Sequence, residues 1–98
     1  MTFAVLAEPS RRHILDLLRV RERTVNELVQ QLRLSQPGVS KHLRVLRDAG
    51  LVNVRVDAQR RLYRVRPEPL QELDAWLAPY RALWSSALDK LEQHLEES

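Results

Sequence analysis

The chain has 98 residues, of which 44% are apolar and 30% are charged, and its formal net charge is +3 at pH 7. This length allows one small domain and this composition is typical of globular proteins, so several domains and intrinsic disorder are excluded. The absence of cysteine excludes disulfides, thiolate catalysis and thiolate metal sites.

The first predicted elements are short helices. Residues 3–6 form an apolar start, and Pro9 suits the first turn of a second helix. The apolar stripe of this second helix is Ile14, Leu15, Leu17 and Leu18. Thr24 and Glu27 then have the spacing of a capping box, in which each side chain accepts from a free amide at a helix start. The helix that they open is expected to bury Val25, Leu28, Val29 and Leu32.

The segment from Ser35 to Val52 is the most informative part of the sequence. Ser35 can cap a helix, Pro37 tolerates its first turn, and Gly50 suits the left-handed position past its end. One side of this helix carries Val39, Leu43 and Leu46, and the remaining surface carries Ser40, Lys41, Arg44 and Arg47. Two short helices joined by a tight turn, the second of them basic, predict a helix-turn-helix with its recognition helix over about residues 35–49.

Beyond Gly50 the apolar spacing changes from helical to alternating. Val52, Val54 and Val56 are expected to face one way, a polar turn covers residues 57–60, and alternation then resumes. This pattern predicts a two-stranded hairpin over about residues 52–66. A hairpin directly after a recognition helix is a wing, so we expect a winged helix-turn-helix: a mainly α fold of about five helices with a small β-hairpin.

A seven-residue apolar repeat marks the last predicted helix, over about residues 69–96. The repeating positions hold Leu70, Leu77, Trp84 and Leu91, and Leu73, Tyr80, Ala87 and His94. Because this surface is too long for the small core to cover, we expect a second copy of the chain to cover it. Pro79 can either kink this helix or divide it in two. Trp76, Tyr80 and Trp84 could line a small-molecule pocket at the seam, but we favour plain packing.

Positive charge is concentrated in the first two thirds of the chain. Residues 1–66 contain 14 Lys and Arg against 6 Asp and Glu, a balance of +8, whereas residues 67–98 contain 2 against 7, a balance of −5. Concentrated positive charge is the footprint of nucleic-acid binding, although a merely solvated surface explains the charge alone equally well. The basic recognition helix favours double-stranded DNA as the partner.

Eight residues are predicted to contact DNA: Ser35, Gln36, Ser40, Lys41, His42, Arg44, Arg60 and Arg61. Those near the amino end of the recognition helix are expected to reach base edges, where Gln36 can pair bidentately with adenine. Lys41 can read guanine or neutralise phosphate, and phosphate is the safer prediction for Arg44. The two wing arginines can enter the minor groove or grip phosphates, and one of them can instead only face solvent.

Several of these positions have a structural alternative. Ser35 can simply cap the helix, His42 can be a packed and hydrogen-bonded histidine, and Arg47 can be only a solvated charge. Gly38 costs about 1 kcal/mol inside a helix relative to alanine. We attribute that cost to close packing of the preceding helix, with close approach of DNA as the alternative. Residues 11 and 12, both arginine, suit either contact with the DNA backbone or intramolecular salt bridges.

The motifs resemble those of the ArsR/SmtB family of bacterial winged-helix repressors. The match is densest in S-Q-P-G-V-S-K-H-L-R-V-L-R-D-A-G-L-V, and it extends to E-P-S-R-R-H-I-L-D-L-L, to R-R-L-Y-R-V and to the last helix. The resemblance implies a homodimer, paired through its first and last helices, that binds operator DNA and blocks transcription. The expected interface residues are Phe3, Leu6, Leu73, Leu77, Tyr80, Trp84, Leu88 and Leu91.

The chain departs from the metal-sensing members of that family. It lacks the cysteines that thiolate sensors place before the recognition helix. Where other members have a D-x-H…H pattern on the last helix, Asp74 is followed by Trp76, and His94 is the one histidine of that helix. One imidazole and flexible carboxylates are a poor transition-metal site, so we expect no metal and no cofactor. The glycine often found before the wing arginine is replaced by Gln59.

The sequence thus predicts one domain over residues 1–98 that binds an inverted-repeat operator as a homodimer and represses transcription. Its own operon is one possible target. A winged-helix protein-interaction module and a nonspecific architectural DNA-binding protein are the alternatives. No catalytic constellation is present, so we expect no enzyme. Without a bilayer-spanning apolar run or a secretory pattern, we expect no membrane association and a cytoplasmic location. Whether a small-molecule effector exists is left open.

Overall fold

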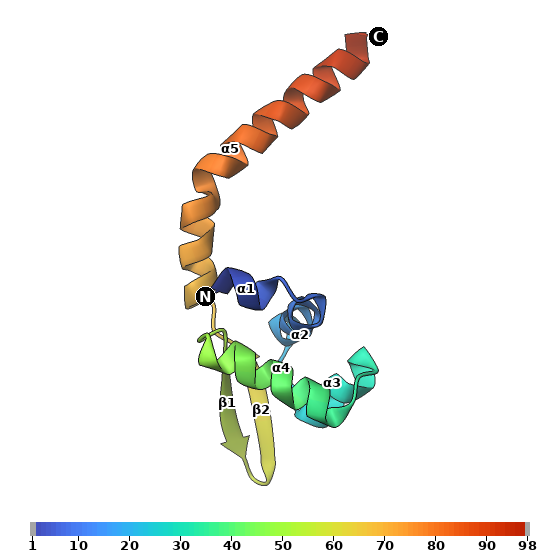
Figure 1. Ribbon diagram of the computed structural model, residues 1–98, viewed down its shortest axis with the longest axis vertical. Coiled ribbons are helices and arrows are strands. Elements are labelled where there is room, and N and C mark those ends of the chain that lie inside the picture. Colours follow the sequence, from blue (N-terminus) through green and yellow to red (C-terminus); the bar gives the residue numbers. More distant parts are fainter. Residues whose placement is uncertain (1, 98) are drawn as a thin grey trace.

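The order of elements is that of a winged helix-turn-helix, in a computed structural model that describes residues 2–97 (Figure 1). The helices are α1 (Thr2–Leu6), α2 (Pro9–Val20), α3 (Val25–Leu32), α4 (Gln36–Asp48) and α5 (Glu68–Glu97). The strands are β1 (Val52–Asp57) and β2 (Arg60–Val65). The predicted fold of five helices and a two-stranded wing is confirmed, and the predicted recognition helix corresponds to α4.

The helix starts follow the capping signals of the sequence. Pro9 occupies the first turn of α2, and the Thr24–Glu27 capping box at the start of α3 is complete, with amide-to-oxygen distances of 3.2 and 3.1 Å. Ser35 caps α4, because its Oγ accepts a hydrogen bond from the Gly38 amide at 3.1 Å. These side chains satisfy amides that have no partner inside the helix, and so define where each helix begins.

The end of α4 turns the chain into the wing. Gly50 has a φ of +76°, and its amide donates to the carbonyl of Arg47 at 2.9 Å. The amide of Leu51 donates to the carbonyl of Leu46, also at 2.9 Å, which completes a Schellman motif. Leu51 is fully buried, so the turn is anchored in the core and sets the direction in which β1 leaves.

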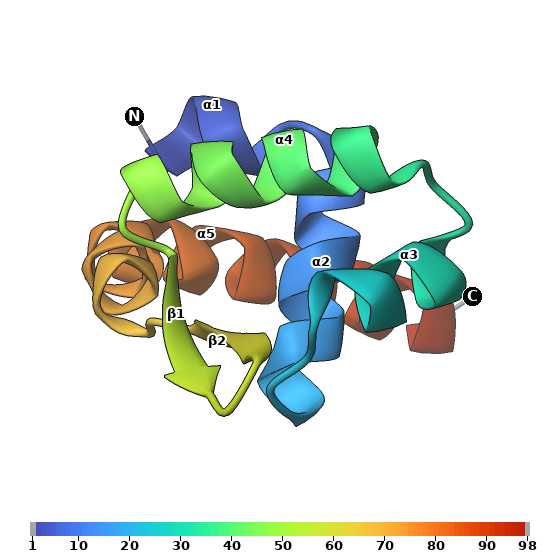
Figure 2. The same ribbon diagram turned by 90° about the horizontal axis from the view of Figure 1, so that it is seen from below.

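The core lies between α2, α3, α4 and the root of the wing. Its fully buried members are Ile14, Leu28, Val39, Leu43, Leu46, Leu51 and Val52. The predicted stripe of α4 is therefore confirmed as core, whereas the stripes of α2 and α3 are buried in part, since Leu17, Val25, Val29 and Leu32 only pack against the core. The predicted inward face of β1 is buried only at its root, because Val52 is buried whereas Val56, near the tip, is 70% exposed. The tip of the wing projects beyond α4 in Figure 1, while Figure 2 shows the hairpin alongside α2.

The hairpin is held to the body by an isolated β-bridge. Its two strands pair antiparallel from Val52 opposite Val65 to Asp57 opposite Arg60. Arg23 pairs with Tyr63 through two backbone hydrogen bonds of 3.1 and 2.9 Å. The buried Arg23 side chain also donates from Nε to the carbonyl of Leu17 at the end of α2. These contacts keep β2 close to α2 and α3.

Helix α5 extends away from the winged body and bends part-way along (Figure 1). Pro79 lies inside this helix, where it has no amide to donate and its ring presses on the preceding turn. The helix is nonetheless continuous, so the proline kinks the helix and does not divide it. An ion pair between Asp74 and Arg81 spans this region. None of the described helices is both long and apolar enough to cross a bilayer.

Candidate nucleic-acid interface

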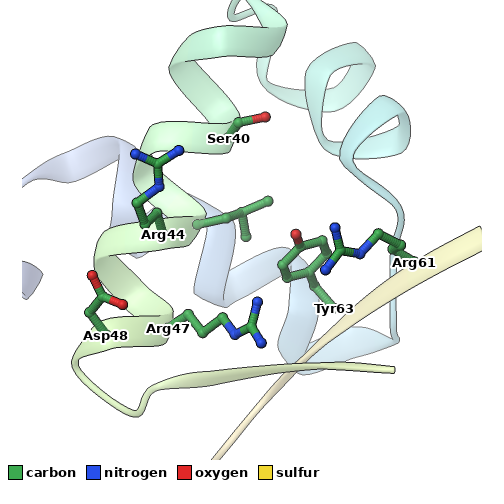
Figure 3. Close-up of a pocket in the computed structure, with 7 residues that line it drawn as sticks. Ser40, Arg44, Arg47, Asp48, Arg61 and Tyr63 are labelled. Carbon is green, nitrogen blue, oxygen red and sulfur yellow. The ribbon is translucent and has the colours of Figure 1, made fainter. Parts of the chain in front are cut away.

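A polar hollow of about 570 Å³ lies between the recognition helix α4 and strand β2 of the wing (Figure 3). It is lined by Ser40, Leu43, Arg44, Arg47, Asp48, Arg61 and Tyr63. The lining residues of α4 are spaced three and four positions apart along the chain, so they lie on one side of the helix. Because the Schellman turn after α4 returns the chain directly into the hairpin, the wing faces this side of the helix.

Three arginines face this hollow: Arg44 and Arg47 from α4, and Arg61 from β2 (Figure 3). Over residues 2–97, no hydrogen bond or ion pair engages any of these three guanidinium groups. Other arginines are paired, since Arg55 binds Glu22 at 2.7 Å. Unpaired guanidinium groups around a concave surface create a positive potential and offer donors that match phosphate oxygens.

The two wing arginines have different surroundings. Arg60 is paired with Asp57 at 3.1 Å across the hairpin turn, whereas Arg61 lies in the hollow. The turn itself contains Ala58 with a φ of +57°, a region that favours glycine. The wing turn contains no glycine, and the residue that adopts the positive φ is Ala58, one position before Gln59.

The amino end of α4 is open to solvent. Gln36 and Lys41 are exposed, and Ser40 is half-buried at the edge of the hollow. Ser35 is exposed but its hydroxyl is engaged as the helix cap, so its structural role is confirmed. A cation and two uncommitted polar side chains thus lie beside the arginine hollow on one continuous surface.

His42 lies on a different side of α4. At 3.6 residues per turn it is about 200° round the helix from both Ser40 and Arg44. Its Nδ1 accepts a hydrogen bond from Arg11 Nε at 3.3 Å, and the imidazole is half-buried. These contacts support the structural alternative for His42 over contact with DNA.

One expectation about the helices is wrong. Gly38 is not pressed by α3: a Cβ at this position would meet Ser35 Oγ at 3.0 Å, and no other described atom outside α4 and the adjoining residues lies within 4 Å. Arg11 and Arg12 form no salt bridge within residues 2–97, so that alternative is not supported, and their contact with the DNA backbone stays a prediction. They donate instead to backbone carbonyls at the end of α1, at distances of 2.8 to 3.3 Å.

Sequence reasoning missed Tyr63 and left Arg47 undecided. The hollow brings both residues together with Arg44 and Arg61. Arg47 follows Ser40 and Arg44 at helical spacing, which is a signal that could have placed it on the same side of α4. Tyr63 belongs to a strand that pairs on both edges, and its place in the hollow depends on that pairing.

Two charged side chains, the Glu27 carboxylate at the start of α3 and the Arg55 guanidinium on the wing, have partners that shift their pKa. The hydrogen bond from the Thr24 backbone amide, followed by that from the Arg21 side chain, lowers the pKa of Glu27 below its ordinary value of 4.5. The hydrogen bond to Glu22 raises the pKa of Arg55. Arg55 is thus committed to an intramolecular pair, which distinguishes it from the arginines of the hollow.

The apolar residues of α5 are exposed within one chain. Trp76, Tyr80 and Trp84 are each about half exposed, and they line a shallow apolar hollow together with Leu77 and Leu83. Within one chain these aromatic residues do not form core, so the packing predicted for them requires a second copy of the chain. The apolar surface continues along α5 through Leu88, Leu91 and Leu95. Phe3 of α1 joins it by contacting Trp76.

The predicted interface residues Leu6, Leu73 and Leu77 are half-buried in the single chain. Leu6 packs partly against the core, so it offers less surface than Phe3 to another molecule. Across the described range, no group of three or more His, Asp or Glu side chains has the arrangement needed to hold a metal ion.

Several known transcriptional regulators have sequences similar to this chain. Residues 8–54 match the family described as bacterial regulatory protein, arsR family. The chain is 42% identical over 78 residues to the arsenic resistance transcriptional regulator ArsR1 of Pseudomonas putida, covering 79% of the chain but only 61% of that relative. It is 39% identical over 83 residues to the HTH-type transcriptional regulator Rv2034 of Mycobacterium tuberculosis, covering 85% and 75%. It is 36% identical over 70 residues to the arsenical resistance operon repressor of Staphylococcus xylosus, covering 71% and 67%.

Solved structures share the fold. A crystal structure of a possible transcriptional regulator for arsenical resistance matches with a TM-score of 0.70 and 43% identity, over 79% of the chain and 80% of the other. A homodimeric winged helix-turn-helix DNA-binding domain from Mycobacterium bovis, a possible ArsR-family regulator, matches with a TM-score of 0.65 and 30% identity. That match covers 81% of the chain and 73% of the bacterial domain.

Proposed function

This chain belongs to the arsR family of bacterial regulatory proteins, and from that premise we propose that it is a repressor that binds an inverted-repeat operator as a homodimer. The observation that carries the proposal is the hollow between α4 and the wing, where Arg44, Arg47 and Arg61 have no intramolecular partner within residues 2–97. Residues 1–98 act as one unit in this proposal.

The hollow takes phosphates of the DNA backbone. Guanidinium groups bind phosphate oxygens through charge-assisted and often bidentate hydrogen bonds. Arg44 and Arg47 reach the backbone from the helix while Arg61 reaches it from the wing. Affinity therefore depends largely on counterion release and falls steeply with added salt.

The amino end of α4 reads bases in the major groove. In this proposal Gln36 pairs with adenine, Ser40 donates or accepts at several bases, and Lys41 donates to guanine. Ser35 contributes its cap and a phosphate contact. Arg60 adds a phosphate contact at the wing tip, for which it exchanges its exposed Asp57 partner, an exchange of small cost because exposed ion pairs contribute little. His42 is assigned a structural role.

A second copy of the chain covers the exposed apolar side of α5 and α1. The surface that it covers includes Phe3, Leu73, Leu77, Tyr80, Trp84, Leu88 and Leu91, with Leu6 at its edge. The homodimeric neighbour from Mycobacterium bovis supports this assignment. A two-fold dimer presents two recognition helices to successive major grooves of one duplex, about 34 to 36 Å apart, which is why the operator is an inverted repeat.

The test is a gel-shift titration with a duplex from the region upstream of the protein's own gene, against a scrambled duplex of equal length. Wild-type protein is expected to prefer the upstream duplex. The triple variant Gln36→Ala, Ser40→Ala, Lys41→Ala should bind both duplexes equally. Retained preference in that variant contradicts the base-reading roles. Equal wild-type affinity for both duplexes favours a nonspecific architectural protein, and no binding to either favours a protein-interaction module.

A further inference from the structure

Arg11 joins three helices that differ in function. It lies in the first turn of α2, and its Nε donates to Nδ1 of His42 on the recognition helix at 3.3 Å. One of its terminal nitrogens donates to the carbonyl of Val5 on α1, also at 3.3 Å. The Val5 side chain is buried in the core, so the carbonyl that Arg11 holds belongs to a fixed part of α1. Arg11 therefore ties α4 and α1 to α2 at one point.

The neighbouring arginine makes only half of this connection. Arg12 donates to the carbonyls of Leu6 and Ala7 at 2.8 and 3.2 Å, and no described contact links it to α4. Carbonyls at a helix end lack partners within the helix, and a cation beside them is favourable, so both arginines stabilise the end of α1. Among the described contacts of these two arginines, Arg11 reaches the recognition helix and Arg12 does not.

The same short helix carries the aromatic contact to α5. Phe3 meets Trp76 edge to face, so a continuous series of contacts runs from Trp76 through Phe3 and the α1 backbone to Arg11 and His42. At one end of this series is the apolar surface assigned to the dimer, and at the other is the recognition helix. A displacement of α4 against the dimer surface must break or distort the Arg11 contacts.

We propose that Arg11 is a positioning residue that holds the recognition helix, through His42, in a fixed place relative to the dimer surface, and thereby sets the spacing of operator half-sites that the dimer accepts. This inference rests on the proposed function. Arg11 needs no contact with DNA for this role, because His42 lies on the side of α4 turned away from the arginine hollow. His42 contributes an acceptor nitrogen that orients the guanidinium.

The experiment compares operator spacings. Wild-type protein, Arg11→Met, Arg12→Met and His42→Asn are titrated against the upstream duplex and against the same duplex with one base pair inserted between half-sites. The methionine keeps much of the apolar stem of arginine but no donor. Asparagine can offer an acceptor oxygen close to the position of Nδ1, so His42→Asn is the conservative rescue. Arg12→Met is the matched control that loses the contacts to the Leu6 and Ala7 carbonyls but no link to α4.

Arg11→Met is expected to bind the native spacing about three- to tenfold more weakly, the effect of one or two lost hydrogen bonds. It should also discriminate less between the two spacings, whereas Arg12→Met and His42→Asn keep the wild-type ratio. Equal ratios for Arg11→Met and wild type would overturn the proposal, as would a reduced ratio in Arg12→Met.

A second measurement tests the contact without DNA. The ¹⁵N resonance of His42 Nδ1 should move in Arg11→Met and stay in place in Arg12→Met, and an unmoved resonance in both contradicts the contact itself. Thermal unfolding of each variant shows whether the fold is retained. Failure of wild-type protein to prefer the upstream duplex contradicts the proposed function, while normal wild-type preference with unchanged Arg11→Met spacing contradicts the positioning role alone.

Discussion

The rings of Phe3 and Trp76 meet edge to face, with centroids 5.4 Å apart and planes inclined by 69°. Trp76 also contacts Tyr80, with a centroid distance of 4.8 Å. The first helix and the root of the last helix are thereby joined into one apolar surface, because aromatic pairs prefer this edge-to-face geometry and gain stability beyond the burial of their area. Beyond this contact α5 has no cover from the described part of its own chain.

Leu88→Glu is expected to convert the protein into a monomer. Leu88 is 61% exposed in the single chain, so a carboxylate there leaves the winged body intact but would be buried without a partner in a dimer. Sedimentation velocity at micromolar concentration measures the change. Gln93→Glu adds the same charge to the polar side of α5 and should remain dimeric. A dimeric Leu88→Glu protein would place the interface elsewhere.

Arg47→Ala is expected to reduce the salt dependence of operator binding. Because Arg47 faces the hollow without an intramolecular partner, its loss should remove about one phosphate contact and lower the slope of log K against log salt by about one. The affinities for operator and scrambled duplexes should fall alike. Arg19→Ala, on the exposed side of α2, is the control and should leave the slope unchanged. An unchanged slope in Arg47→Ala would show that the hollow does not hold phosphate.

Ala58→Gly is expected to stabilise the protein. Ala58 has a φ of +57° at the wing tip, a conformation that costs an L-residue about 1 to 2 kcal/mol and glycine almost nothing. Part of that gain is offset by the greater freedom of glycine in the unfolded chain. Urea unfolding should show a net rise of about 1 kcal/mol. Gln59→Gly, in the same turn but without positive φ, should instead be neutral or destabilising, and a similar rise there would contradict the strain argument.

Glu27→Gln is expected to flatten the acid side of the stability profile. The pKa of Glu27 is lowered by the Thr24 amide and by Arg21, so the folded state binds this proton less readily than the unfolded chain. The stability from this group is present above pH 4.5 and is lost as the pH falls through the lower, folded-state value. Glutamine can keep the cap oxygen without the titration. Urea midpoints measured from pH 7 to pH 3 should fall less in the variant, and parallel profiles would contradict the assignment.

Much of the fold follows from local signals in the sequence. The capping box at Thr24 and Glu27, the Ser35 cap and the left-handed Gly50 each act over a few residues, so their spacing alone locates helix ends. The apolar stripes locate the core because a helix or a strand repeats its sides at a fixed period. The same logic identified α4 as basic on one side and α5 as apolar along its length.

The roles of individual cations required the tertiary structure. Arg11, Arg47, Arg60 and Arg61 are alike in sequence, yet one ties α2 to α4, two face the hollow and one pairs with Asp57. Similarly, Gly38 meets its own helix cap and not the neighbouring helix. Such outcomes depend on which elements pack together and at what angle, and contacts between residues far apart in the chain have no local signature. Periodicity and caps were therefore enough to determine the elements, whereas the partner of each long, flexible arginine was decided only once those elements had met.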